Sequence, residues 1–355
     1  MEPRKALALL SEFRTGTTRS AATDTSLFGA RQFDNSVAVF DAATNTVVAT
    51  IMTGVSVSGL GIDTQTGTTY VSDFVTRGRL FAIEPDGKVS IIEVSQLRPG
   101  FGVPGQVEVD ERSSRIYVIS SNSSGGSGGI PPLIALDRTT RALVATLKPE
   151  EWVFGSPQAL AIDERRNLLY VAASSDSTNR VLVFDGTKLS EDTRVSAALL
   201  ANITVGREDN TELAQGIAVD AEGRVSPNPA QAILGVIPIK LLPAANIPVV
   251  ADYSSRELAF NPEQGLLYGV TKSSAPFREG FISVINSALV IDANRKFIDT
   301  PHRDVSGALN SLIATLPAGI DPEFIVVDPS PSRNRVAVTN QSLGALSVLQ
   351  GLSIR

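Results

Sequence analysis

Cysteine is absent from the 355 residues of this chain, and His302 is its only histidine. Without cysteine the chain can form no disulfide framework, no Cys-ligated zinc or iron–sulfur site and no thiol nucleophile. A single imidazole also excludes histidine-rich metal sites and most Ser–His or His–His chemistry. Any site in this chain must therefore work mainly with carboxylates, amides and arginine.

Positive charge is scarce as well, with 31 Lys and Arg against 37 Asp and Glu, a net charge of −6. Nucleic-acid binders need a basic face to neutralise phosphates, so we expect no nucleic-acid partner. The most apolar stretch, residues 230–250, carries Lys240 and is interrupted by Pro238, Pro243 and Pro248. Prolines at that spacing break a membrane-spanning helix, so we expect no membrane span.

The first residues give a weak targeting signal. Arg4 and Lys5 precede only five apolar residues, which is too short for the core of a signal peptide. We expect residues 1–25 to form an N-terminal extension with a short amphipathic helix over residues 1–13. The missing cysteine favours an exported protein, periplasmic or secreted, because stray thiols are a liability in an oxidising compartment.

One pattern recurs along the chain: an apolar run that ends in Asp, a polar turn, and then Tyr-Val or an equivalent pair. It is present in LGIDTQTGTTYVSD (60–73), VEVDERSSRIYVIS (107–120), LAIDERRNLLYVAA (160–173), LAFNPEQGLLYGVT (258–271) and IVVDPSPSRNRVAVTN (325–340), with a degenerate copy at 217–225. An apolar strand, a turn-forming Asp and a β-branched or aromatic strand predict a β-hairpin. The repeated Asp63, Asp110, Asp163, Asp220 and Asp328 therefore indicate turn geometry and not catalysis.

A second hairpin follows most of the first ones, as in VAVFDAATNTVVATI (37–51) and LIALDRTTRALVATL (133–147). Two consecutive hairpins make a four-stranded antiparallel unit, and six or seven such units predict an all-β fold, a single β-propeller over residues 26–355. Residues 27–51 match the last three strands of a unit, so seven blades fit best, with six as the alternative. We expect strands from both chain ends to close the ring. A closed ring needs no partner to cover its sheet edges, so we expect a monomer.

These hairpins resemble the YVTN family of β-propeller repeats. The resemblance is carried by Tyr70-Val71-Ser72-Asp73, Tyr117-Val118, Tyr170-Val171 and Val338-Thr339-Asn340, each followed by a second hairpin. It covers residues 26 to 350 and implies the fold, but says little about function. Residues 220–257 lack a Tyr-Val element, and residues 286–311 insert a polar stretch.

A site is expected at the end of the axial channel where the innermost strands begin and the Tyr-Val strands end. The gluconolactonase-like and virginiamycin-lyase-like propellers, more distant relatives, carry metal-binding or catalytic residues five positions before the Asp. Those positions and their neighbours here are Ser58, Gly105, Gln106, Gln158, Gln215, Arg256, Glu257 and Glu323. None is the histidine that the lyase mechanism would use.

The gluconolactonase-like resemblance implies an acidic metal ligand, which Glu323 supplies. Asn340, Asp73 and Asn122 are the partner oxygen donors, and such hard ligands suit Ca²⁺ or Mg²⁺. No other cofactor is expected. The alternative is that Glu257 and Glu323 form ion pairs with Arg256 or a neighbouring blade.

Aromatic residues are concentrated in the segments expected at the same end. Phe101, Trp152 and Phe154 lie in loops that lead into innermost strands, and Phe74 follows a Tyr-Val element, as Lys272 follows its equivalent. Aromatic side chains with a few polar groups are typical of a pocket for an apolar small molecule. The alternative is that they plug the channel and pack the tops of the blades.

Two functions remain open at this point. The chain is either a binding protein whose channel end holds a small molecule or a protein partner, or an enzyme, a hydrolase, lyase or isomerase, acting on a small apolar molecule. In the second case Glu323, Glu257 and Arg256 are the catalytic candidates, because a buried carboxylate can do acid–base work without histidine.

Overall fold

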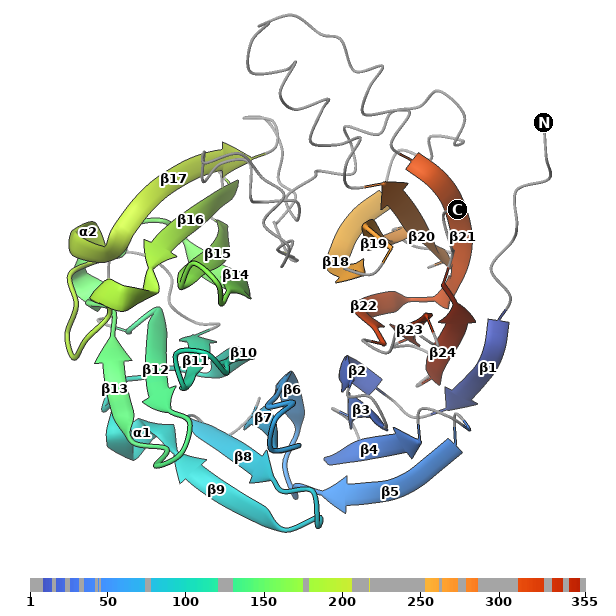
Figure 1. The fold of residues 1–355 in the computed structure, drawn as a ribbon, viewed down its shortest axis with the longest axis horizontal. Helices are drawn as coiled ribbons and strands as arrows, with labels where there is room; N and C mark the ends of the chain where they lie inside the picture. Colours follow the sequence, from blue (N-terminus) through green and yellow to red (C-terminus); the bar gives the residue numbers. More distant parts are fainter. Residues whose placement is uncertain are drawn as a thin grey trace, which may run out of the picture.

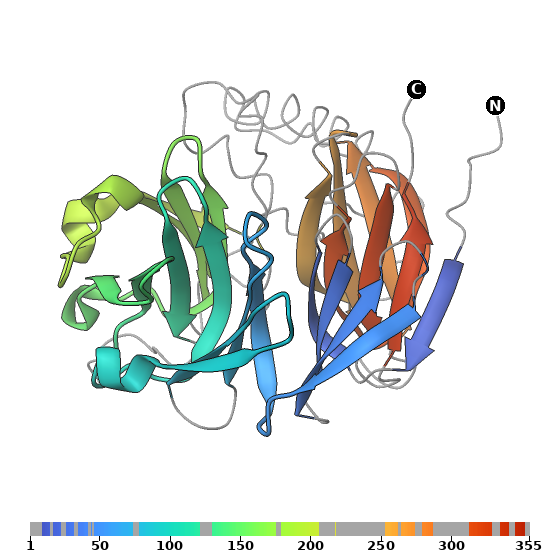
Figure 2. The same cartoon turned by 60° about the horizontal axis from the view of Figure 1, so that its bottom comes forward.

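Six four-stranded antiparallel sheets stand around a common axis, as the blades of a β-propeller (Figure 1). The structure is a computed structural model, and it describes residues 9–14, 17–22, 26–31, 35–41, 44, 46–73, 78–120, 130–174, 179–205, 217, 253–261, 264–273, 279–286, 312–328, 334–340 and 345–351. Figure 2 shows the same blades from the side. The predicted fold class is confirmed.

In five of these sheets the strands follow one another from the axis outward. The first is β2 (Thr17–Ala22), β3 (Ser26–Arg31), β4 (Ser36–Asp41) and β5 (Thr46–Met52); the second is β6 (Val57–Ile62), β7 (Thr69–Asp73), β8 (Arg79–Ile83) and β9 (Val89–Glu93). The third is β10 (Pro104–Asp110), β11 (Arg115–Ser120), β12 (Leu133–Asp137) and β13 (Leu143–Thr146); the fourth is β14 (Ser156–Asp163), β15 (Leu168–Ser174), β16 (Asn179–Asp185) and β17 (Leu199–Val205).

The fifth sheet has the same order, and the sixth closes the ring. The fifth is β18 (Tyr253–Asn261), β19 (Leu266–Ser273), β20 (Glu279–Asn286) and β21 (Leu312–Ile320); the sixth is β22 (Pro322–Val327), β23 (Arg335–Asn340), β24 (Ala345–Gln350) and β1 (Leu9–Arg14). Short helical turns lie between strands: α1 (Val94–Leu97), η1 (Pro149–Glu151), η2 (Gly186–Lys188) and α2 (Val195–Ala198). Within the described residues, no helix is long and apolar enough to cross a membrane.

The N-terminal residues complete a blade. β1 pairs antiparallel with β24, with Phe13 opposite Leu346, so strands from both chain ends close the ring as expected. The short helix expected over residues 1–13 is wrong for positions 9–13, which lie in a strand. β2 pairs with β3 as the innermost strand of the next blade, so residues 17–22 also belong to the propeller and not to an extension.

The turns of the first hairpins are built by the repeated Asp residues. Asp63 Oδ1 accepts hydrogen bonds from the N–H groups of Gln65 and Thr66, both 3.1 Å long. Asp110 Oδ1 accepts from Ser113 N–H at 2.8 Å, and Asp163 Oδ1 from Arg166 N–H at 3.1 Å. A carboxylate that holds a turn in this way is an Asx-type turn, which confirms the structural interpretation of the repeat.

Blades widen outward, and their side chains follow that taper. Near the axis, a Cβ on Gly59 would lie 1.9 Å from the carbonyl oxygen of Gly105 in the next blade, so only glycine fits there. One strand further out, Tyr70, Tyr117 and Tyr170 are buried in the second strands of their blades. At the closest approach of β6 to β10 the packing thus requires glycine, whereas one strand further out it accommodates tyrosine.

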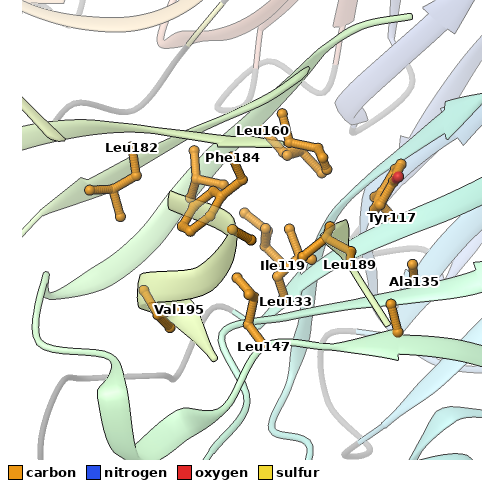
Figure 3. Packing of buried hydrophobic residues seen from close by; sticks show 14 of the residues in the cluster. Tyr117, Ile119, Leu133, Ala135, Leu147, Leu160, Leu182, Phe184, Leu189 and Val195 are labelled. Carbon is orange, nitrogen blue, oxygen red and sulfur yellow. The ribbon is translucent and has the colours of Figure 1, made fainter. Parts of the chain in front are cut away.

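Hydrophobic clusters join neighbouring blades. Figure 3 shows the cluster in which Tyr117, Ile119 and Leu133 of one blade pack with Leu160 and Phe184 of the next. Comparable clusters join the blade of β6–β9 to both of its neighbours, the blade of β2–β5 to that of β22–β24, and the blade of β18–β21 to that of β22–β24.

The number of blades stays a prediction. Seven were predicted from six first hairpins and the additional unit ending in residues 27–51. Six are seen in the described residues, among them the one with residues 27–51, whereas the hairpin predicted at 217–225 lies outside them apart from Ile217. Ile217 is 4% exposed and packs against Ala159, Tyr170 and Val181 of the blade of β14–β17.

Candidate functional site

The end of the propeller where the innermost strands begin is here called the bulge end, because each of these strands has its register shift there. The shifts fall between Val57 and Leu60 in β6, Pro104 and Val107 in β10, Pro157 and Ala159 in β14, Ser255 and Leu258 in β18, and Pro322 and Ile325 in β22. They contain the positions five before the Asp that the sequence singled out. An extra residue bends the strand and leaves backbone groups without a ladder partner.

Side chains supply partners for those backbone groups. The N–H of Gly59 donates to Ser72 Oγ at 2.6 Å, and the N–H of Phe324 donates to Thr339 Oγ at 3.1 Å. Ser72 and Thr339 occupy equivalent places in β7 and β23. A buried amide without a partner is costly, so these hydroxyls stabilise the bend in each blade.

Gln106 supplies a hydrogen-bond partner for a backbone N–H of the neighbouring blade. Its Oε1 accepts a hydrogen bond from Leu160 N–H of the following blade at 2.9 Å, and its Nε2 donates to Glu108 Oε1 at 2.7 Å. Gln106 is buried, with 7% of its surface exposed. Gln158 lies in the shift of β14, is half-buried, and donates from Nε2 to the carbonyl oxygen of Ser156 at 3.3 Å.

Asp73 and Asn340 lie at the ends of β7 and β23 and are both fully buried. Asp73 Oδ2 lies 2.9 Å from Nη2 and 3.0 Å from Nε of Arg79, an ion pair that closes the β7–β8 hairpin. Asn340 Nδ2 donates to Ser347 Oγ at 2.8 Å. The Asp73 carboxylate is thus engaged by its own blade, whereas Asn340 is held through its Nδ2 and its buried Oδ1 accepts no hydrogen bond in the described part of the chain.

The aromatic candidates pack between blades. Trp152 is 2% exposed, its ring stacks on Phe184 with centroids 6.3 Å apart, Phe154 meets it edge-on at 5.4 Å, and its Nε1 donates to Gly155 O at 2.6 Å. Phe101 is 4% exposed, in the cluster with Leu80 and Val94. Their loops run from an outermost strand to the next innermost one, so these residues lie in blade-to-blade cores and not open at the channel mouth.

The remaining candidates cannot be placed with their side chains. Ser58, Arg256, Glu257, Lys272 and Glu323 lie in β6, β18, β19 and β22, and only their backbone is described. Phe74, Asn122 and Gln215 lie outside the described residues. The catalytic, metal-binding and ligand-binding roles given to these residues stay predictions. Among the described residues, no group of three His, Cys, Asp or Glu could hold a metal ion.

The opposite end, where the Asp turns lie, is here called the turn end, and it is held by carboxylates that reach from one blade to the previous one. Glu111 Oε1 accepts from Thr64 N–H and Thr64 Oγ1, both at 2.6 Å, and from Gln65 N–H at 3.2 Å. Glu164 Oε1 in turn accepts from Glu111 N–H at 3.4 Å. Burial raises the pKa of Glu164, and the nearby Asp110 and Glu111 raise it further.

Arginines cross between blades at the same end. Arg138 Nη1 lies 3.2 Å from Asp63 Oδ1 and also donates to Gln65 Oε1. Arg141 pairs with Glu84, donates to Ser90 Oγ at 2.6 Å and lies over the Tyr70 ring, 5.9 Å from its centroid. The hydrogen bond from Arg141 lowers the pKa of Glu84. Sequence reasoning missed these contacts, because they join residues 46 to 75 positions apart.

The buried tyrosines are held in the protonated form. Burial, together with the carboxylate of Asp163, raises the pKa of Tyr170 to about 12. Burial also raises the pKa values of Tyr70 and Tyr117. Phenols with such pKa values stay protonated near neutral pH and act as packing groups there.

Solved structures similar to this chain are propellers. Hydrazine synthase of Kuenenia stuttgartiensis is 13% identical, with a TM-score of 0.71, and 99% of each chain is covered. The β-propeller domain of Cps50 (Swd1) of Myceliophteria thermophila is 13% identical, with a TM-score of 0.63, covering 98% of this chain and 100% of that one. A chain of a mitotic checkpoint complex is 9% identical, with a TM-score of 0.60, covering 100% of this chain and 94% of that one. At these identities the likeness shows the fold alone.

No family model and no curated protein matches the sequence.

Proposed function

We propose that this propeller is a binding module, whose bulge end holds a small molecule or a protein partner. One observation carries the proposal: the described polar side chains at that end complete the propeller itself. Gln106 caps a neighbouring blade, Asp73 pairs with Arg79, and Asn340 bonds to Ser347. Side chains engaged in this way build a rigid rim, which suits a docking platform better than proton transfer.

The similar solved structures support the same function. One of them is a chain of a complex, the mitotic checkpoint complex, and another is a propeller domain, that of Swd1. A propeller offers a stable ring with loops at either end, and loops positioned by a rigid scaffold are where binding residues gather. The inference comes from fold-level analogy and from the rim described above.

We also propose that the blades are YVTN-type repeats. Tyr70, Tyr117, Tyr170 and Tyr268 occupy the second strand of four different blades, and all four are buried. The Asp or Asn that begins each turn is buried as well, as in Asp63. The repeat residues therefore recur at equivalent places in space as well as in sequence.

Catalysis on a small apolar molecule is the second candidate, and one observation favours it. The register shifts of β18 and β22 carry Arg256, Glu257 and Glu323, and these two strands are neighbours in the ring. The backbone thus brings the two acidic candidates and the arginine to the same end of adjacent blades. A carboxylate and an arginine there could supply acid–base and electrostatic chemistry.

Native mass spectrometry with metal analysis on freshly purified protein tests the two functions. If the chain is a binding module, we expect a bound molecule that the Glu323→Gln variant retains and the Gln158→Arg variant, which adds bulk at the bulge end, loses. Arg165→Glu is the control, because Arg165 is exposed at the turn end of the same blade. Loss of a small substrate's turnover in Glu323→Gln, with an unchanged melting temperature, would instead support the enzyme.

A further inference from the structure

The outer edge of β5 is exposed, whereas the outer edge of β13 is covered by another segment of the chain. All of Thr46 to Thr50 and Met52 are exposed, with Val48 at 60% and Met52 at 65%. β5 pairs with β4 on one side, and no strand lies on its other side in the described part of the chain. β5 is therefore an open sheet edge with apolar side chains.

Three other outermost strands, β13, β21 and β9, are protected. The segment 190–193 covers β13, because Thr146 N–H donates to Ser190 O at 3.1 Å and Thr193 N–H donates to Thr146 O at 2.8 Å. β21 contains Pro317. β9 contains the charged Glu93, and its Ser90 Oγ accepts a hydrogen bond from Arg141 of the next blade. Cover, proline and charge are the devices that keep sheet edges from pairing. The sequence of β5, TVVATIM, has no charge and no proline.

We infer that β5 is a self-association edge, at which β5 of one copy pairs antiparallel with β5 of a second copy. The sequence of β5 is compatible with a second copy of itself. In every antiparallel register, Thr, Val, Ala, Ile and Met lie opposite one another, and no register places two like charges together. Pairs of β-branched residues across strands are favourable, and an isologous pairing about a two-fold axis closes at two copies. Main-chain hydrogen bonds then join two blades into one continuous sheet.

The register shift opposite Val39 and Phe40 limits the pairing. It leaves Val48 as an extra residue within β5, a bulge that disfavours edge pairing there, while Ala49 to Met52 keep regular pairing with β4 and are the residues that pair with the second copy. A contact of so few residues is smaller than a standard stable interface, so the dimer dissociates on dilution. This changes the expectation of a monomer: the ring needs no partner for its fold, yet one of its outer edges is free to pair.

Analytical ultracentrifugation from about 1 µM to about 1 mM protein tests the inference. We expect the average mass to rise from one chain toward two. Thr50→Lys, at an exposed position of the regularly paired stretch, should raise the dissociation constant at least about tenfold by placing like charges together at the edge. Ile91→Lys, at a 52% exposed position of β9, is the matched control and should leave it unchanged.

Three outcomes would overturn the inference. The wild type could stay a single chain over the whole range, its mass could grow past two chains without a plateau, or Ile91→Lys could weaken the dimer as much as Thr50→Lys does. Hydrogen exchange of the wild type at both concentrations gives a second readout, in which slowing at 46–52 is expected and slowing elsewhere alone contradicts it.

Discussion

The two ends of the propeller are stabilised by different chemistry. At the bulge end, neutral groups satisfy the bent inner strands: the hydroxyls of Ser72 and Thr339 and the amide of Gln106. At the turn end, the carboxylates of Glu111 and Glu164 and the guanidinium groups of Arg138 and Arg141 connect successive blades. The bends of the inner strands should therefore respond little to pH, whereas the charged contacts between blades at the turn end should respond more.

The largest effect is expected from steric change at the bulge end. In Gly59→Ala, the new Cβ would meet Gly105 O at 1.9 Å, and that atom belongs to a backbone that cannot move aside. We expect the free energy of unfolding to fall by about 3 kcal/mol. Urea denaturation measures it.

Gly87→Ala is the control for that variant. Gly87 has a φ of 84° but nothing within 4 Å of an added Cβ, so only backbone strain of about 1 kcal/mol is expected. Equal losses in the two variants would contradict a tight approach of β6 to β10.

The second-largest effect is expected from removing the uncharged side chain of Gln106, which bonds to the backbone of the neighbouring blade. Gln106→Leu leaves the N–H of Leu160 and the side chain of Glu108 without their partner, which should cost about 2 kcal/mol of unfolding free energy. The loss should be the same at pH 6 and pH 8, because neither Gln106 nor the Leu160 amide titrates and ordinary carboxylates are ionised throughout that range. Gln158→Leu, which breaks only a 3.3 Å bond within its own strand, should cost less than about 0.5 kcal/mol.

Smaller and pH-dependent effects are expected at the turn end. The folded-state pKa of Glu84 is lowered, first by its hydrogen bond from Arg141. A lowered pKa contributes stability above the unfolded-state pKa, and this is lost as the pH falls through the folded value. Arg141→Met should therefore destabilise the protein at pH 7 by about 0.5 kcal/mol and much less in acid. Denaturation at several pH values measures it, and a pH-independent loss would show that Arg141 acts by packing alone.

Glu164 should give an effect of the same small size, with the opposite sign. Its folded-state pKa is raised by burial, so its contribution is complete below the unfolded pKa and is lost as the pH rises through the folded one. Gln keeps an oxygen that can accept from Glu111 N–H, so Glu164→Gln should gain about 0.5 kcal/mol at pH 7 and nothing in acid. A loss at pH 7 would mean that the charge itself holds the neighbouring turn.

Local patterns were enough to predict the hairpins and the blades. Each of Asp63, Asp110 and Asp163 accepts a hydrogen bond from a backbone N–H two or three residues later, so a short stretch of sequence is enough to predict its role. Contacts between blades are not local: Arg138 meets Asp63 75 positions earlier, and no short pattern contains both. The Ala-Leu run before Phe13 was wrongly predicted as a helix, again because a distant contact decides its structure. It forms a strand by pairing with β24, which lies more than 300 residues later in the sequence.

The places of the candidate site residues in the fold were predicted in part, while their roles stay predictions. The positions five before the Asp do share one end of the ring, in register shifts that the sequence did not reveal. Trp152 and Phe101 were expected near the channel because they precede innermost strands, but their loops first cross the outer part of the blades. Sequence separation from an inner strand does not measure distance from the axis.

The most direct test of the binding proposal is a hydrogen-exchange footprint. Exchange is measured on the protein isolated with its natural binding partner and again after the partner is removed. We predict slowed exchange at the starts of three inner strands, residues 57–60, 104–107 and 156–159, in the bound protein. Slowing confined to the turn end, at residues 63–68, 110–115 and 163–168, would contradict a binding surface at the bulge end.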